Sequence, residues 1–256
     1  MDALRTCLRT IGALCRREML TRFGKYRFGY IWAFIEPALY IALFAAVRTF
    51  LGRASPFGES AILFFLIALI TFRSSMSIMR RTGGAIDSNM SLLALPPVKT
   101  FDVVLARIVV EAVTWSVISA AFIVGLWAAS GLWSIARLEI FLPGYLAALY
   151  LGASLGFLVA MLTKLVPFFD RFMALISLPL FVMSGIFFLP ITMPPQVLTV
   201  LWYNPFLHAV EWVRSGVFYT YEPVLSEAYL LWFATCSLFL GLALNKFYQR
   251  RLYSAS

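Results

Sequence analysis

The chain has 256 residues, of which 62% are hydrophobic and only 13% are charged. Soluble domains are about half apolar and about a quarter charged, so this composition indicates a protein embedded in lipid. The net charge of +9 does not indicate nucleic-acid binding, because the basic residues form short clusters between long apolar runs. Three cysteines and one histidine provide neither a disulfide framework nor a metal site. The length fits a single membrane domain over residues 1–256.

Six apolar stretches are long enough to cross a bilayer core of about 30 Å as helices. With the amino terminus inside, 16 of the 21 lysines and arginines fall in inside segments and only 4 in outside segments. This bias predicts an all-α integral membrane protein with both termini in the cytoplasm. The predicted membrane helices are about 28–50, 59–79, 106–130, 139–162, 172–190 and 226–245.

The amino-terminal segment, residues 3–22, has the pattern of an amphipathic helix. Apolar residues such as Leu4 and Leu8 share one helical face, and Arg9 and Arg16 lie on another. Such a helix is expected to lie on the cytoplasmic surface of the membrane. Two roles fit the pattern equally, a lipid anchor and a docking surface for a cytosolic partner.

Residues 85–97 lie in the cytoplasmic loop between the second and third membrane helices. Asp87 or Ser88 could cap a short helix that Pro96 and Pro97 would end. The loop is too long and too apolar for a plain connection, so it is a candidate contact for a partner. The alternative is a loop that packs against the base of the helix bundle.

Residues 190–225 follow a proline-rich break and are dense in aromatic residues. They are too polar to span the membrane and too aromatic to lie free in water. We predict short helices at the outer interface or dipping into it.

Three ionisable residues, Glu36, Arg73 and Glu111, fall within predicted membrane helices. At 1.5 Å per residue, each lies about 10–14 Å from the cytoplasmic charges. Their similar depth predicts one buried network in which Arg73 is paired with a carboxylate. We favour a structural ion pair, with proton coupling by an unpaired carboxylate as the alternative.

The enzyme classes that we considered lack their motifs in this chain. Residues 24–29 have the glycine spacing of a phosphate loop, but the lysine and the Ser or Thr that should follow are absent. Asp87 and Asp102 stand alone, so a metal-dependent lipid phosphotransferase or glycosyltransferase is disfavoured. We therefore expect a transport protein that is not an enzyme and binds no cofactor itself.

A stripe of small residues follows one face of the fourth predicted membrane helix. Ala148, Gly152, Gly156 and Ala160 recur at every fourth position, which allows another helix to approach closely. We favour a contact within one chain, with a dimer interface as the alternative.

Aromatic residues also cluster at the start of the first membrane helix. Tyr26, Tyr30 and Phe34 recur at every fourth position, beside Trp32. The pattern favours an interfacial aromatic belt, although aromatic rings could also line a path for sugars.

Residues 22–37, RFGKYRFGYIWAFIEP, closely resemble the start of the first membrane helix in KpsM-like permeases. These permeases belong to capsular polysaccharide ABC exporters, in the type-two exporter family. Residues 92–102, LLALPPVKTFD, and the aromatic segment before the last helix are also similar to that family. The resemblance covers essentially the whole chain. The resemblance distinguishes capsular polysaccharide exporters less clearly from O-antigen and teichoic-acid exporters.

The resemblance implies a homodimeric permease in the bacterial inner membrane. Each permease would dock to a cytosolic ATPase subunit that holds ATP and Mg. The substrate would be a lipid-linked capsular polysaccharide, passed on to a periplasmic co-polymerase-type adaptor and an outer-membrane export protein. The alternatives are a permease for another lipid-linked glycan and a proton-coupled secondary transporter that uses Glu36 or Glu111.

The resemblance also implies roles for individual residues. Residues 3–22 and 85–97 become contacts with the ATPase, with Arg9, Arg16, Arg17, Asp87, Asn89, Leu92 and Leu93 as candidates. Residues 190–225 become an outer gate region. The candidates for the glycan path and gate are Tyr26, Tyr30, Trp32, Phe34, Phe187, Phe188, Trp202, Tyr203, Trp212 and Tyr219.

Overall fold

The computed structural model describes the backbone of residues 2–23, 29–50, 57, 60–93, 98–131, 135–166 and 168–254, and most side chains between 9 and 247. All regular structure in these ranges is helical. The long helices are α1 (Asp2–Phe23), α2 (Gly29–Phe50), α3 (Ala61–Gly83), α5 (Thr100–Ser130), α6 (Leu138–Leu165), α7 (Phe169–Met183) and α10 (Glu227–Ser254). The shorter ones are η1 (Asp87–Asn89), α4 (Met90–Leu93), η2 (Pro190–Thr192), α8 (Pro195–Leu201) and α9 (Pro205–Val217).

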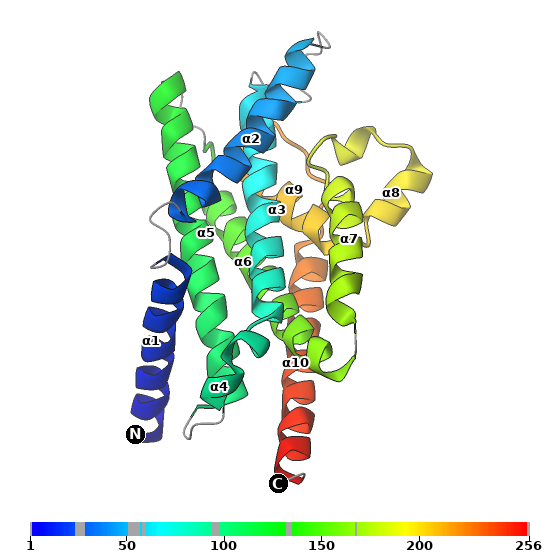
Figure 1. Cartoon of the computed structure of the whole chain (residues 1–256). Helices are drawn as coiled ribbons and strands as arrows, with labels where there is room; N and C mark the ends of the chain where they lie inside the picture. Colours follow the sequence, from blue (N-terminus) through cyan, green and yellow to red (C-terminus); the bar gives the residue numbers. More distant parts are fainter. Residues whose placement is uncertain are drawn as a thin grey trace.

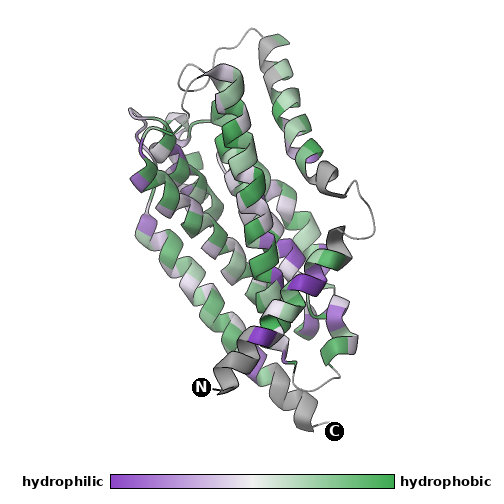
Figure 2. Ribbon diagram, turned by 90° about the vertical axis from the view of Figure 1, so that its left-hand side faces the viewer, coloured by the Kyte–Doolittle hydropathy of each residue, from purple (hydrophilic) through white to green (hydrophobic). Residues whose placement is uncertain are grey.

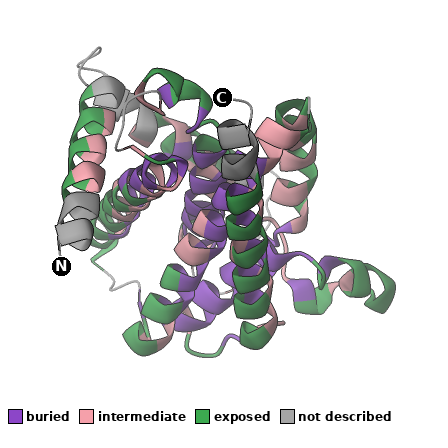
Figure 3. Ribbon diagram, turned by 90° about the horizontal axis from the view of Figure 1, so that it is seen from below, coloured by how far each residue is buried: buried purple, intermediate pink, exposed green. Residues whose placement is uncertain are grey.

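The helices form an elongated bundle with α3 near its centre (Figure 1). The helix α3 packs against α5, α6 and α9, and α6 also packs against α10. Seen along the bundle, buried residues gather on the central helices and exposed residues on the outward faces (Figure 3). The helix α1 begins and α10 ends at the same end of the bundle, here called the terminal end (Figure 1).

Four helices are long and apolar enough to cross a membrane. They are α3, α5, α6 and the Glu227–Phe247 part of α10, and they are hydrophobic over most of their length (Figure 2). Each coincides with a predicted span, so four of the six predicted positions hold a candidate span. The helix α7 has only 15 residues, and the apolar part of α2 found among the described residues is Phe34–Phe44. A total of six spans therefore stays a prediction.

The stripe of small residues on α6 faces α3. A Cβ atom added at Gly152 would lie 2.5 Å from the backbone oxygen of Ser75, closer than van der Waals contact allows. The Ser75 hydroxyl donates a hydrogen bond of 2.7 Å to the backbone oxygen of Ala148. The favoured prediction, a close contact within one chain, is confirmed. Removing side-chain bulk from α6 lets the two backbones touch.

The segment after α7 is folded into short helices, as predicted. The helix α9 begins after Asn204, whose side chain accepts a hydrogen bond of 3.0 Å from the backbone N–H of Phe206. All 13 residues of α9 are buried. This helix is therefore packed inside the bundle, against α3 and α6, and does not lie on its surface.

Candidate functional site

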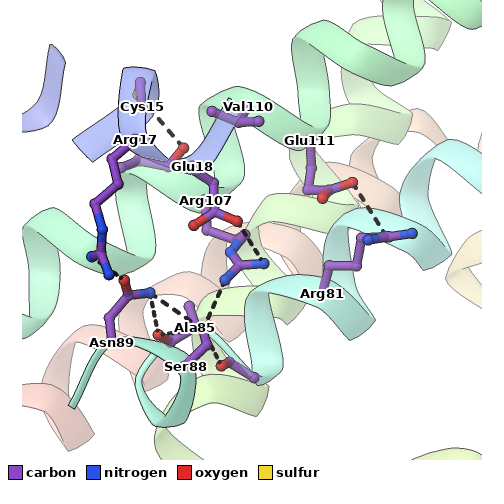
Figure 4. A network of polar contacts seen from close by, with 12 residues as sticks. Cys15, Arg17, Glu18, Arg81, Ala85, Ser88, Asn89, Arg107, Val110 and Glu111 are labelled. Atoms are coloured by element: carbon purple, nitrogen blue, oxygen red, sulfur yellow. Dashed lines mark hydrogen bonds and ion pairs between the residues drawn. The ribbon is translucent and has the colours of Figure 1, made fainter. Parts of the chain in front are cut away.

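A network of polar contacts joins α1, the turn after α3, and α5 near the terminal end (Figure 4). Arg17 on α1 donates a hydrogen bond of 3.1 Å to the side-chain oxygen of Asn89. Glu18, the next residue on α1, forms an ion pair of 2.9 Å with Arg107 on α5. Arg107 also donates a hydrogen bond of 2.7 Å to the hydroxyl of Ser88. These contacts therefore connect three segments that are far apart in the sequence.

Sulfur and apolar contacts complete the junction between α1 and the bundle. The Cys15 thiol lies 3.6 Å from the backbone oxygen of Ala106 on α5, and burial raises its pKa. Leu14 packs against a buried cluster that includes Ala85, Val104 and Phe157. Part of the apolar face of α1 therefore packs against the rest of the chain.

The predicted ATPase-contact residues fall into two groups. Arg9, Arg16 and Arg17 are exposed on α1. Asn89 is buried, and its amide donates a hydrogen bond of 2.9 Å to the backbone oxygen of Ala85. Its place on the predicted contact surface is therefore corrected, because both ends of its side chain are engaged within the chain.

The remaining contact candidates lie in the turn after α3. Asp87 is exposed and forms an ion pair with Lys164 at the end of α6. The prediction that Asp87 or Ser88 caps a helix is wrong, since η1 begins without a side-chain cap and Ser88 instead bonds to Gly84 and Ala85. The other candidates, Leu92 and Leu93, are half-buried. Pro96 and Pro97, the predicted end of this helix, lie outside the described residues.

The intramembrane charges form two pairs where a single network was predicted. Arg73 on α3 pairs with Glu36 on α2. Glu111 on α5 is fully buried and lies 3.7 Å from Arg81, about two helical turns beyond Arg73 on α3. The expected pairing of Arg73 with a carboxylate is present, but Glu111 has a different partner because α5 faces a later part of α3.

A polar cavity of about 360 Å³ lies between α2, α3 and α5. Glu36, Arg73, Arg80 and Arg81 line it, together with Trp115 and other residues. Among the described residues that line it are three arginines and one glutamate. Since Glu36 pairs with Arg73 and Glu111 pairs with Arg81, the excess positive charge among the described residues rests on Arg80.

The aromatic candidates are dispersed. Phe34 lies beside Phe122 of α5, with ring centroids 6.0 Å apart, and Phe187 packs on Phe44 of α2 at 4.5 Å. Phe188 is half-buried. The side chains of Tyr26, Tyr30 and Trp32 lie outside the described residues.

The other aromatic candidates belong to the 190–225 segment. Tyr203 and Tyr219 are exposed, and Trp202 is partly exposed. Trp212, by contrast, is only 7% exposed and packs against Gly144 of α6. Its ring is buried against α6 in the single chain, and its role as a path or gate residue stays a prediction.

A buried charge cluster on α9 was not predicted as a site. The Glu211 carboxylate accepts hydrogen bonds from the Tyr221 hydroxyl at 2.6 Å, from Arg214 at 3.3 Å and from the backbone N–H of Val224 at 3.1 Å. Burial raises the pKa of Glu211, and Arg214 and the hydrogen bonds oppose that rise. The Arg214 guanidinium also stacks 3.8 Å from the Phe64 ring centroid on α3. The only signal in sequence was the spacing of Glu211 and Arg214 by three residues in an apolar segment.

His208 ties α9 to the segments on both sides of it. Its Nε2 lies 2.8 Å from the backbone oxygen of Trp202, and its Nδ1 accepts a hydrogen bond of 3.1 Å from the backbone N–H of Ser226. Nδ1 must therefore be unprotonated. Burial lowers the pKa of His208, with the bond to Trp202 opposing it.

Comparison with known proteins places this arrangement in a family. Residues 9–218 match the sequence profile of the family described as "ABC-2 type transporter". The chain belongs to the ABC-2 type transporter family. The match begins within α1 and ends just after α9, so it includes the terminal-end network and the Glu211 and Arg214 members of the buried charge cluster.

Named relatives of this ABC-2 type transporter chain are similar over most of their length. The polysialic acid transport protein KpsM of Escherichia coli is 30% identical over 93% of this chain and 92% of its own length. The capsule polysaccharide export inner-membrane protein CtrC of Neisseria meningitidis is 29% identical, over 82% of this chain and 79% of its own. The capsule polysaccharide export inner-membrane protein BexB of Haemophilus influenzae is 28% identical, over 84% of this chain and 83% of its own length. The resemblance inferred from sequence is confirmed.

Proposed function

We propose that this chain is the membrane permease of an ATP-driven exporter that moves lipid-linked capsular polysaccharide across the bacterial inner membrane. The observation that carries the proposal is the nearly full-length similarity to KpsM, CtrC and BexB, whose names state polysialic acid transport or capsule polysaccharide export. Similarity along the whole chain favours the same role more than a shared motif would. Another lipid-linked glycan is the alternative substrate.

In this proposal the chain crosses the membrane six times, with α2 and α7 as the two shorter spans. The terminal end faces the cytoplasm, so both termini lie inside. The distribution of lysine and arginine supports this orientation, since 16 of the 21 fall in the segments assigned inside.

The functional assembly contains two copies of this chain and two cytosolic ATPase subunits that bind ATP and Mg. Exposed Arg9 and Arg16 on α1, with the turn around Asp87, would contact the ATPase. The polar network supports this role, because it connects α1 and that turn to the membrane helices α3 and α5. A periplasmic adaptor and an outer-membrane protein complete the proposed export route.

Gene deletion tests the proposal in the source bacterium. We expect surface capsule to disappear while polysaccharide accumulates inside the cell, and a plasmid copy to restore export. Arg16→Glu should lower ATPase co-purification and export together, whereas Glu222→Arg, a charge reversal at the exposed opposite end, should leave ATPase binding intact. Normal surface capsule in the deletion strain would contradict the proposal.

A second assay separates ATP-driven export from proton-coupled transport. Inverted membrane vesicles should transport the glycan when ATP is supplied and the proton gradient is collapsed. The pairing of Glu36 with Arg73 and of Glu111 with Arg81 favours this outcome, because each carboxylate has a cationic partner. Transport that requires the gradient and not ATP would establish the secondary transporter instead.

A further inference from the structure

The charged cavity between α2, α3 and α5 has hydrogen-bond donors that no described group satisfies. Trp115 is only 7% exposed, lines the cavity, and its indole N–H has no partner among the described residues. The Nε of Arg73 is also without a partner there. Arg80 is exposed at the cavity edge, and no ion pair joins it to the described residues. Buried donors without an acceptor are costly in a membrane, and Arg80 is left without a counterion among the described residues.

An apolar groove adjoins this cavity. It has a volume of about 240 Å³ and is lined almost entirely by apolar side chains, among them Phe34, Val113 and Val117. Ile118 lines both the groove and the charged cavity, so the two lie next to each other. Val113 and Val117 are more than half exposed, which leaves the groove open along the outward face of α5.

We propose that these two spaces together form a binding site for an anionic lipid. The phosphate lies in the cavity, where Arg80, Arg73 and the Trp115 N–H donate to its oxygens, and an acyl chain lies in the groove beside Val117. Guanidinium groups match phosphate geometry and form charge-assisted hydrogen bonds with it. A free anion would leave the groove uncovered, and a neutral lipid would leave the excess positive charge uncompensated. An anionic amphiphile satisfies both surfaces.

The lipid phosphate has two sources that share this chemistry. One is the lipid anchor of the exported glycan, an assignment that rests on the proposed function. The other is an anionic phospholipid of the surrounding membrane. The site itself is tested on the purified chain, without ATPase or glycan, so its failure is distinguishable from failure of the proposed function.

The first measurement is lipid binding by native mass spectrometry, using delipidated full-length protein with phosphatidylglycerol or phosphatidylcholine. Phosphatidylglycerol should bind more tightly. Arg80→Gln should weaken its binding several-fold, and combination with Trp115→Phe should weaken it by about tenfold or more. The matched controls Arg171→Gln and Trp232→Phe change an exposed arginine and an exposed tryptophan away from the cavity and should bind as wild type. Unchanged phosphatidylglycerol binding by Arg80→Gln and by the double variant would overturn the proposal.

A second variant tests the groove separately. Val117→Trp should fill the groove and weaken phosphatidylglycerol binding, while the affinity for inorganic phosphate, measured by calorimetry, stays the same. If Val117→Trp leaves lipid binding intact, the acyl-chain assignment is wrong. Surface-capsule assays of Arg80→Gln then identify the source: reduced export indicates the anchor of the glycan, and normal export with weakened lipid binding indicates a membrane phospholipid. Both results support the site.

Discussion

Arg17 on α1 donates a hydrogen bond to Asn89 in the turn after α3, 72 residues further along the chain. The Glu18–Arg107 ion pair reinforces this junction from the next residue. A force applied to the exposed face of α1 would therefore reach the turn after α3 and the start of α5. The two segments that sequence assigned separately to partner contact form one structural unit.

The Arg17–Asn89 bond should be measurable as a coupling energy. Arg17→Ala and Asn89→Ala should each destabilise the protein, and the double variant should lose less than the sum, with a coupling of about 1 kcal/mol. Denaturant unfolding in detergent, followed by tryptophan fluorescence, provides the measurement. Arg16→Ala, at an exposed neighbouring position, is the control. Strict additivity would mean that the bond contributes nothing to the junction.

The ion pair between Arg73 and Glu36 predicts a specific rescue. Arg73→Leu should destabilise the protein by about 1–3 kcal/mol, since it leaves the partly exposed Glu36 carboxylate without its partner. Adding Glu36→Leu should recover much of that stability, whereas adding Glu111→Leu should not, because Glu111 pairs with Arg81. Thermal aggregation in detergent compares the variants. Rescue by Glu111→Leu would instead support the single network of Glu36, Arg73 and Glu111 that was predicted from sequence.

Close contact between α3 and α6 predicts opposite outcomes at two glycines. Gly152→Ala places a Cβ atom 2.5 Å from the Ser75 backbone oxygen and should cost about 1–3 kcal/mol of stability. Gly125→Ala on α5 meets nothing within 4 Å and should be neutral or stabilising, since alanine favours helix. The midpoint of thermal unfolding is the readout. Equal midpoints would show that the two helices can separate without loss of stability.

His208 predicts a pH dependence of stability. Because burial lowers its pKa in the folded protein below the ordinary value of 6.5, the unfolded chain takes up a proton first as the pH falls. Its contribution to stability is therefore complete above pH 6.5 and is lost progressively below it. His208→Gln should flatten the stability profile between neutral pH and the lower pKa of the folded state. A wild-type profile as flat as that of the variant would contradict this assignment.

Local sequence was sufficient for the helical spans and for the close packing of α6. An apolar run of about 20 residues must form a helix in lipid, whatever its neighbours are. The repeat of Ala148 and Gly152 likewise leaves one helix face without large side chains. This pattern predicts a close helix contact, although it does not identify the partner helix. The short helices after α7 followed from the proline break for the same local reason.

What only the tertiary structure decided is which groups meet across helices. Counting residues along the helices predicts the depth of Glu111, but the rotation and tilt of α3 and α5 decide that it meets Arg81 and not Arg73. The same holds for Asn89, an expected surface residue that is turned inward, and for Trp212, an expected gate residue that fills the space at Gly144. Sequence alone determined the membrane class, the four candidate spans and the family, because hydrophobicity and charge act residue by residue. Pairing depends on distances between segments that are far apart in the chain, and packing alone sets those distances.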